Sequence, residues 1–164
     1  MQLLISDTNI IIDLKEGELL EDFFRLPYQF SVPDILFSDE LEERHANLLG
    51  LGLKVSELTE DSMIKAFGLV DKYNGPSRND CLALMLAMQE NCPLLTGDGQ
   101  LKKAAENEGV LVMGTLWVVE ELVKREIISI LSASEAYEKM REGGSRLPWG
   151  LAEERLSHLA ILDD

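Results

Sequence analysis

The chain has 164 residues, of which 46% are hydrophobic, so it is long enough for one globular domain and too short for two of ordinary size. Its 30 acidic and 15 basic residues give a formal net charge of −15, which should repel nucleic acid unless a divalent cation reverses the local charge. No apolar run approaches the roughly 20 residues that cross a bilayer, and residues 1–12 lack the basic start of a signal peptide, so we expect a cytoplasmic protein.

The first predicted element is a short buried strand at residues 2–6, which ends directly at Asp7. Ligands of open α/β sheets bind outside the carboxyl ends of the strands, so this acid is a candidate ligand-holding residue. A short helix is expected at residues 19–26, and a second strand at residues 28–32 is closed by Pro33.

A longer helix is predicted at residues 34–49, because Phe37, Leu41 and Leu48 fall on one face at helical spacing. Glu40 lies on the flank of this apolar face. His45 has no neighbour at zinc-ligand spacing, and we expect it to be a solvated helix residue.

A third strand at residues 53–58 is followed by a predicted helix at residues 59–74. After a break at Gly75, the stretch from Ser77 to Asp80 resembles a capping box and predicts the start of another helix. The apolar residues of that helix lie three, four, seven and eight positions beyond Asp80, which places the acid on the buried face.

A fourth strand at residues 93–96 ends at Asp98, so a second acid is expected at the same edge of the sheet. A helix at residues 100–108 and a fifth strand at residues 110–113 follow. From residue 114 onward the pattern is helical, apart from a break at residues 143–144.

Strands that alternate with helices in this way predict a central parallel sheet with right-handed crossovers. We expect a domain over residues 1–130 and a helical extension over residues 131–164 that packs on it.

Four acids stand out by their context: Asp7, Glu40, Asp80 and Asp98. Taken singly, each has a plain alternative, as a helix cap, a turn residue or a solvated side chain. Taken together they indicate a metal site, since a buried ionised carboxylate is costly unless it is paired or binds a metal. An all-oxygen site suits Mg²⁺ or Mn²⁺. Hydroxyl and amide groups that could orient these carboxylates belong to Thr8, Asn9 and Thr96.

The order and spacing of these motifs resemble a PIN domain, especially the toxin nucleases of VapC type. The resemblance is carried by Ser6-Asp7-Thr8-Asn9, an acid beside Leu41, Asn79-Asp80, and Thr96-Gly97-Asp98, and it covers about residues 1–130. It implies a three-layer α/β/α sandwich with a mainly parallel five-stranded sheet. The implied activity is that of a metal-dependent endoribonuclease whose acidic, metal-binding quartet is Asp7, Glu40, Asp80 and Asp98.

Further expectations follow from the same resemblance. The second acid is assigned to Glu40 because Leu41 follows it, with Asp39 and Glu42 as alternatives. A further acid common in the family after the fourth is replaced by Gly99 and Gln100, which leaves open whether one or two metal ions bind. The resemblance also implies a homodimer that an antitoxin protein holds inactive.

Candidate residues for contacting the RNA backbone are Arg78, Lys102 and Lys103, although surface cations are usually only solvated. Two other classes of protein remain open. One is a non-catalytic PIN-like scaffold that binds a protein partner. The other is a Mg²⁺-dependent phosphoryl-transfer domain, but a receiver needs an acidic pair at the first strand and a haloacid-type phosphatase needs Asp-x-Asp, and Asp7-Thr8-Asn9 has neither.

Overall fold

The computed structural model describes residues 1–163, so Asp164, the last residue of the expected extension, lies outside the described part. Within it, five strands form one sheet in the order β3-β2-β1-β4-β5, and every neighbouring pair is parallel. The strands are β1 (Gln2–Ser6), β2 (Tyr28–Pro33), β3 (Lys54–Ser56), β4 (Leu94–Leu95) and β5 (Val112–Met113). The prediction of a single parallel sheet from these five segments is confirmed.

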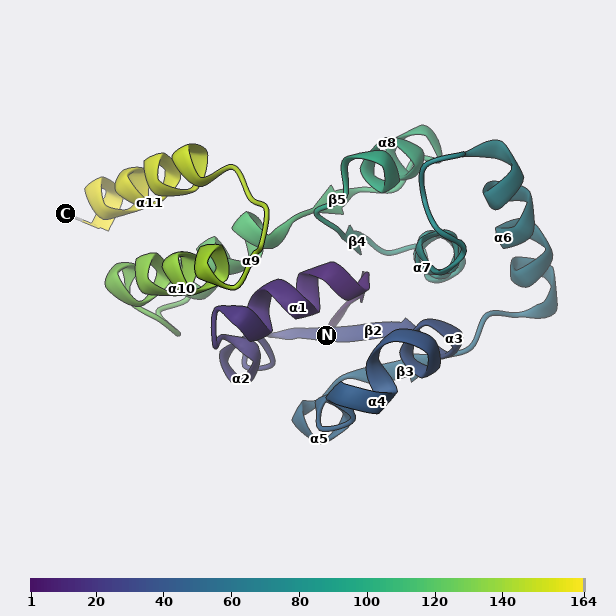
Figure 1. The fold of residues 1–164 in the computed structure, drawn as a ribbon, viewed down its shortest axis with the longest axis horizontal. Helices are drawn as coiled ribbons and strands as arrows, with labels where there is room; N and C mark the ends of the chain where they lie inside the picture. Colours follow the sequence, from purple (N-terminus) through teal and green to yellow (C-terminus); the bar gives the residue numbers. More distant parts are fainter. Residues whose placement is uncertain (164) are drawn as a thin grey trace.

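Helices cover both faces of this sheet (Figure 1). They are α1 (Thr8–Glu16), α2 (Leu20–Phe23), α3 (Asp34–Leu36), a π-helical turn η1 (Phe37–Leu41), α4 (Glu42–His45), α5 (Leu48–Leu51), α6 (Glu60–Lys72), α7 (Arg78–Glu90), α8 (Gly99–Asn107), α9 (Thr115–Lys124), α10 (Ile130–Glu142) and α11 (Trp149–Asp163). Helix α7 packs against β1, β2 and β4, with α6 and α8 beside it. On the other side, α1, α2 and α9 pack together and α10 joins them. The α/β/α layers therefore match the expected fold class.

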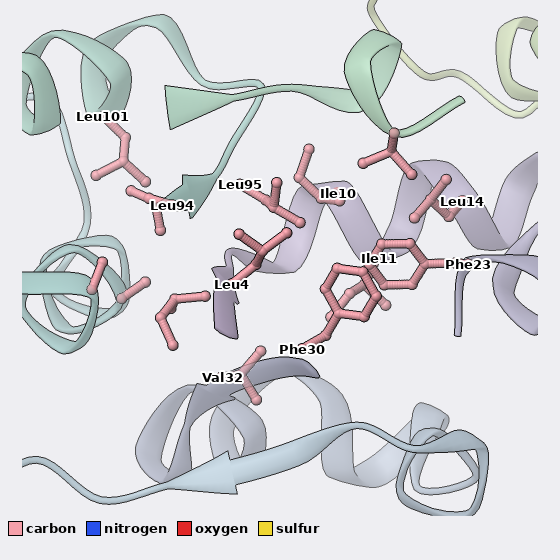
Figure 2. Packing of buried hydrophobic residues seen from close by; sticks show 14 of the residues in the cluster. Leu4, Ile10, Ile11, Leu14, Phe23, Phe30, Val32, Leu94, Leu95 and Leu101 are labelled. Carbon is pink, nitrogen blue, oxygen red and sulfur yellow. The ribbon is translucent and has the colours of Figure 1, made fainter. Parts of the chain in front are cut away.

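The core lies between β1, β2 and the helix layer of α1 and α2 (Figure 2). Phe23 of α2 stacks on Phe30 of β2 with ring centroids 3.8 Å apart, and Ile11 of α1 is also fully buried. Burying a side chain of this size contributes roughly 1.5–3 kcal/mol to stability. This packing fixes α1 against the sheet and so fixes where its first residue lies.

Three local features differ from the sequence-based expectations. Residues 8–16, which carry the run Ile10-Ile11-Ile12, form α1, a helix that was not predicted. The helix expected at residues 34–49 is broken into short pieces around the π-helical turn η1. His45 is buried rather than solvated, because it shares the inward face of this segment with Leu41 and Leu48 at helical spacing.

The C-terminal helices extend the layer that contains α1 and α9. Helix α11 packs on α10 and α9, and Arg155 of α11 forms an ion pair of 2.6 Å with the buried Glu120 of α9. Trp149, at the start of α11, meets the buried Tyr137 of α10 edge to face. No helix within residues 1–163 is long and apolar enough to cross a membrane.

Candidate active site

Asp7 lies at the carboxyl end of the central strand β1 and caps the start of α1. Its Oδ1 accepts a hydrogen bond of 3.0 Å from the Ile10 amide, and its Oδ2 accepts one of 2.5 Å from the Thr96 hydroxyl. The residue is only 1% exposed. Burial raises the pKa of Asp7 to about 7, and the two hydrogen bonds, which favour the charged form, offset only part of this rise.

Thr96 connects the first predicted acid to the fourth. Its hydroxyl donates to Asp7 and accepts a hydrogen bond of 3.0 Å from the Asp98 amide. The connection forms because β4 lies directly beside β1, with Ser6 opposite Leu95, so both strands end at one place. Asp98 in turn caps α8, where its Oδ1 accepts from the Gln100 and Leu101 amides.

Asp80 approaches the same place from the start of α7. It forms the expected capping box with Ser77, since each side chain accepts a hydrogen bond from the amide of the other residue. The side chain is half-buried, and its negative charge contributes to the raised pKa of Asp7. Asp7 and Asp98 therefore cap α1 and α8, and Asp80 lies in the first turn of α7, so the positive ends of the three helix dipoles offset part of their charge.

The second acid lies on the π-helical turn η1 and reaches α7. Glu40 accepts a hydrogen bond of 3.0 Å from the Asn79 side chain, while the neighbouring Asp39 forms an ion pair of 2.9 Å with Arg78. Both acids are exposed. Arg78 thus neutralises Asp39, which leaves Glu40 as the acid that carries an unneutralised charge beside the start of α7.

The other residues expected to orient the acids or contact RNA occupy different settings. Thr96 is buried between two acids, whereas Thr8 Oγ1 is buried and forms no hydrogen bond within the described residues. Asn9 is exposed on α1. Lys102 and Lys103 are exposed on α8, and Lys102 borders a hollow that also contains Thr96.

The sequence did not single out Asp13, on α1, as part of this region. Its Oδ2 accepts a hydrogen bond of 2.9 Å from the Thr115 hydroxyl at the start of α9. Burial raises the pKa of Asp13, and hydrogen bonding to the hydroxyl groups of Ser145 and Thr115 partly offsets the rise. Asp13 and Asp98 line one cavity of about 530 Å³, which separates α1 from the chain between α10 and α11. The only sequence signal was an acid six residues beyond Asp7.

The donor atoms of this region suit a hard divalent cation, because they are carboxylate and amide oxygens. Asn79 Oδ1 is buried without a hydrogen-bond partner in the described chain, so one such oxygen beside Glu40 is unsatisfied. Within residues 1–163, no three acidic, histidine or cysteine side chains are grouped closely enough to hold an ion together. The residue types therefore fit a metal, and binding all four acids to one ion requires their side chains to turn toward one another.

A family model described as PIN domain matches residues 3–160, nearly the whole chain. The chain belongs to the PIN-domain family. Its structure resembles that of a PilT N-terminus domain protein, SSO1118, from the hyperthermophilic archaeon Sulfolobus solfataricus P2, with a TM-score of 0.50 and 17% sequence identity. The alignment covers 76% of this PIN domain and 92% of the archaeal chain, and at this identity it shows the fold alone. No curated protein matches the sequence significantly.

These comparisons confirm the family that the short motifs indicated. PIN domains are generally nucleases, so the chain has a fold on which phosphodiester hydrolysis is common. The same motifs suggested the VapC type in particular, and this finer assignment remains a proposal.

Proposed function

We propose that this PIN domain is a metal-dependent endoribonuclease that hydrolyses RNA phosphodiester bonds, with Asp7, Glu40, Asp80 and Asp98 as its acidic site. The setting of Asp7 carries the proposal. The carboxyl group is buried, and no Lys or Arg of residues 1–163 forms an ion pair with it. A buried carboxylate without a cation is costly, and a bound divalent ion removes that cost.

In this proposal the four acids hold Mg²⁺ or Mn²⁺, which when bound lowers the pKa of a water molecule and stabilises the leaving oxygen. The protein supplies the orientation. Hydrogen bonds from Ile10 and Thr96 occupy one lone pair on each oxygen of Asp7, so both oxygens keep a lone pair for a ligand. Asp98 uses only Oδ1 to cap its helix, which leaves Oδ2 available.

A cleavage assay tests this function. End-labelled single-stranded RNA is incubated with the protein and Mg²⁺ or Mn²⁺, and we expect internal cuts that EDTA abolishes. Asp7→Asn and Asp98→Asn should reduce cleavage to background. Glu43→Gln, which changes an exposed acid of α4 that forms no hydrogen bond within the described chain, should leave it unchanged.

The same assay distinguishes the acids of η1. Glu40→Gln is expected to abolish cleavage, whereas Asp39→Asn should retain most of it because Asp39 is already paired with Arg78. If the parent protein cuts no RNA with either metal, or Asp7→Asn cuts as fast as the parent, the chain is better described as a non-catalytic scaffold.

Metal binding can be measured without cleavage. Starting in chelator, added Mg²⁺ should raise the free energy of unfolding of the parent by about 2.7 kcal/mol at a hundred times the dissociation constant. The gain should be clearly smaller for Asp7→Asn. Equal gains in the two proteins would place the ion elsewhere.

We further propose that the protein is the toxin of a toxin-antitoxin pair, acts in the cytoplasm and forms a homodimer. The resemblance to VapC-type nucleases supports this, and a net charge of −15 suits an antitoxin that presents basic side chains. Sedimentation at micromolar concentration should show a dimer, and co-expression with the neighbouring reading frame should yield a complex. A monomer that forms no complex would contradict the proposal.

A further inference from the structure

Two hollows meet beside the candidate active site. The first, about 530 Å³, lies between α1, the turn after β4 and the chain between α10 and α11. The second, about 400 Å³, lies between that same chain, Lys102 of α8 and the start of α9. Three residues line both hollows: Gly97, Arg146 and Leu147. The hollows are therefore two ends of one groove, which join at Gly97, and Asp98 lines the first of them beside this junction.

The segment between α10 and α11 forms one wall of this groove. Figure 1 shows it, in yellow-green, as the connection that leads from α10 back to α11 on the side of α9. Ser145 of this segment lines the first hollow together with Asp13 of α1, and Pro148 borders the second hollow. The wall thus comes from a part of the chain that contributes none of the four proposed catalytic acids.

Arg146 lies where the two hollows join and Lys102 lines the second hollow, and neither forms an ion pair within residues 1–163. Among the ion pairs of residues 1–163, Arg155 binds Glu120, whereas Arg146 binds no acid, although the first hollow also contains Asp13, Glu16 and Asp98. It is exposed. A guanidinium group binds a phosphate through two parallel hydrogen bonds. Because Arg146 forms no ion pair, a phosphate would not have to displace a carboxylate in order to bind it.

Gly97 keeps the groove open where the two hollows join. A side-chain carbon built at this position meets no atom within 4 Å, and its φ lies outside the region that favours glycine. The space beside Gly97 is therefore open. The backbone conformation of this residue also permits a larger side chain, which would fill that space.

We propose that single-stranded RNA lies in this groove, across Gly97, and that Arg146 binds a backbone phosphate next to Asp98. This inference rests on the proposed ribonuclease function and names the form of its substrate. Each hollow has the volume of a site for one small ligand, which suits successive nucleotides of a single strand. In a protein of net charge −15, one unpaired arginine beside the acids gives the phosphate backbone a point of attachment.

Binding is tested with a fluorescein-labelled oligouridylate of about 12 nucleotides, by anisotropy at several salt concentrations, in Mg²⁺ and separately in EDTA. Arg146→Ala should weaken binding about threefold to tenfold and reduce the slope of log affinity against log salt by about 0.7, the value for one single-strand phosphate contact. The matched control is Arg141→Ala, on the exposed surface of α10, which should bind as the parent does. Gly97→Leu should weaken binding by blocking the groove, with unfolding curves like that of the parent.

Several outcomes would contradict the proposal that RNA binds in the groove. Equal affinity of Arg146→Ala and Arg141→Ala in both buffers would do so, as would the absence of RNA binding by the parent. Faster cleavage by Arg146→Ala would mean that the guanidinium masks the acids instead of holding the substrate. If the parent binds RNA through Arg146 but does not cut it, the groove stands and the ribonuclease function fails. If it cuts RNA and Arg146→Ala has an unchanged KM, the function stands and the groove fails.

Discussion

In metal-free protein, the free energy of unfolding of Asp7→Asn should increase relative to that of the parent as the pH rises. The pKa of Asp7 rises from its ordinary value of 3.8 to about 7, chiefly through burial, so the folded protein binds this proton more tightly than the unfolded chain does. The free energy of unfolding of the parent therefore falls as the pH rises from about 4 to about 7. The whole rise in pKa corresponds to about 4 kcal/mol, and the part between about pH 5.5 and pH 8 to about 2 kcal/mol.

Asparagine has nearly the same shape as aspartate and does not ionise. Its amide oxygen can accept from the Ile10 amide, and its NH₂ group can donate to the Thr96 hydroxyl, which has a free lone pair. Urea unfolding in EDTA measures both proteins at the two pH values. We expect Asp7→Asn to gain about 2 kcal/mol on the parent from about pH 5.5 to pH 8. A difference between the two proteins that does not change with pH would show that burial does not raise this pKa. A large loss in Asp7→Asn at both pH values would show that asparagine cannot replace the hydrogen bonds of the carboxyl group.

Two further substitutions test the supports of the site. Thr96→Ala removes the donor to Asp7 and should cost about 1–3 kcal/mol in urea unfolding, whereas Thr96→Ser should cost much less because it keeps the hydroxyl. Gly17→Ala places a carbon 2.7 Å from Cε of the fully buried Met140 and 3.2 Å from the Ala136 carbonyl oxygen, where α1 meets α10. It should cost about 1–3 kcal/mol, because the backbone oxygen cannot move aside as a side chain can. Its control, Gly50→Ala, meets no atom within 4 Å and should be neutral or slightly stabilising, so equal losses at the two glycines would refute the packing argument.

The layered fold could be predicted because its signals are local and repeated. Short apolar runs separated by helical periodicity were sufficient for the parallel sheet, and Ser77 with Asp80 correctly marked the start of α7. Helix α1 was missed because three successive isoleucines are typical of strands. Burial of Ile10 and Ile11 against the core outweighs the small helix penalty of branched side chains.

The candidate site was less accessible from the sequence. Motif order indicated the family, which the comparison confirmed, but contacts between distant segments carry no local pattern. The Thr96 hydroxyl between Asp7 and Asp98 depends on β4 lying beside β1, an order that alternation alone does not give. Arg146 could not be placed at all, since only the path of the chain after α10 brings it near Asp98.

The use of acids as helix caps affects how loss of activity in related chains should be recognised. Asp7 and Asp98 are the N-caps of α1 and α8, a task that Ser, Thr or Asn performs about as well. Asp80 is the third residue of α7 and completes a capping box with Ser77, a task that Gln also performs. A lineage that abandoned hydrolysis would keep a capping residue at these positions while dropping the carboxylate. Ser or Asn at positions 7 and 98, with Gln at position 80, is thus the expected signature of a PIN domain that has lost its nuclease activity. Residues unable to make these hydrogen bonds would indicate that the helices start elsewhere.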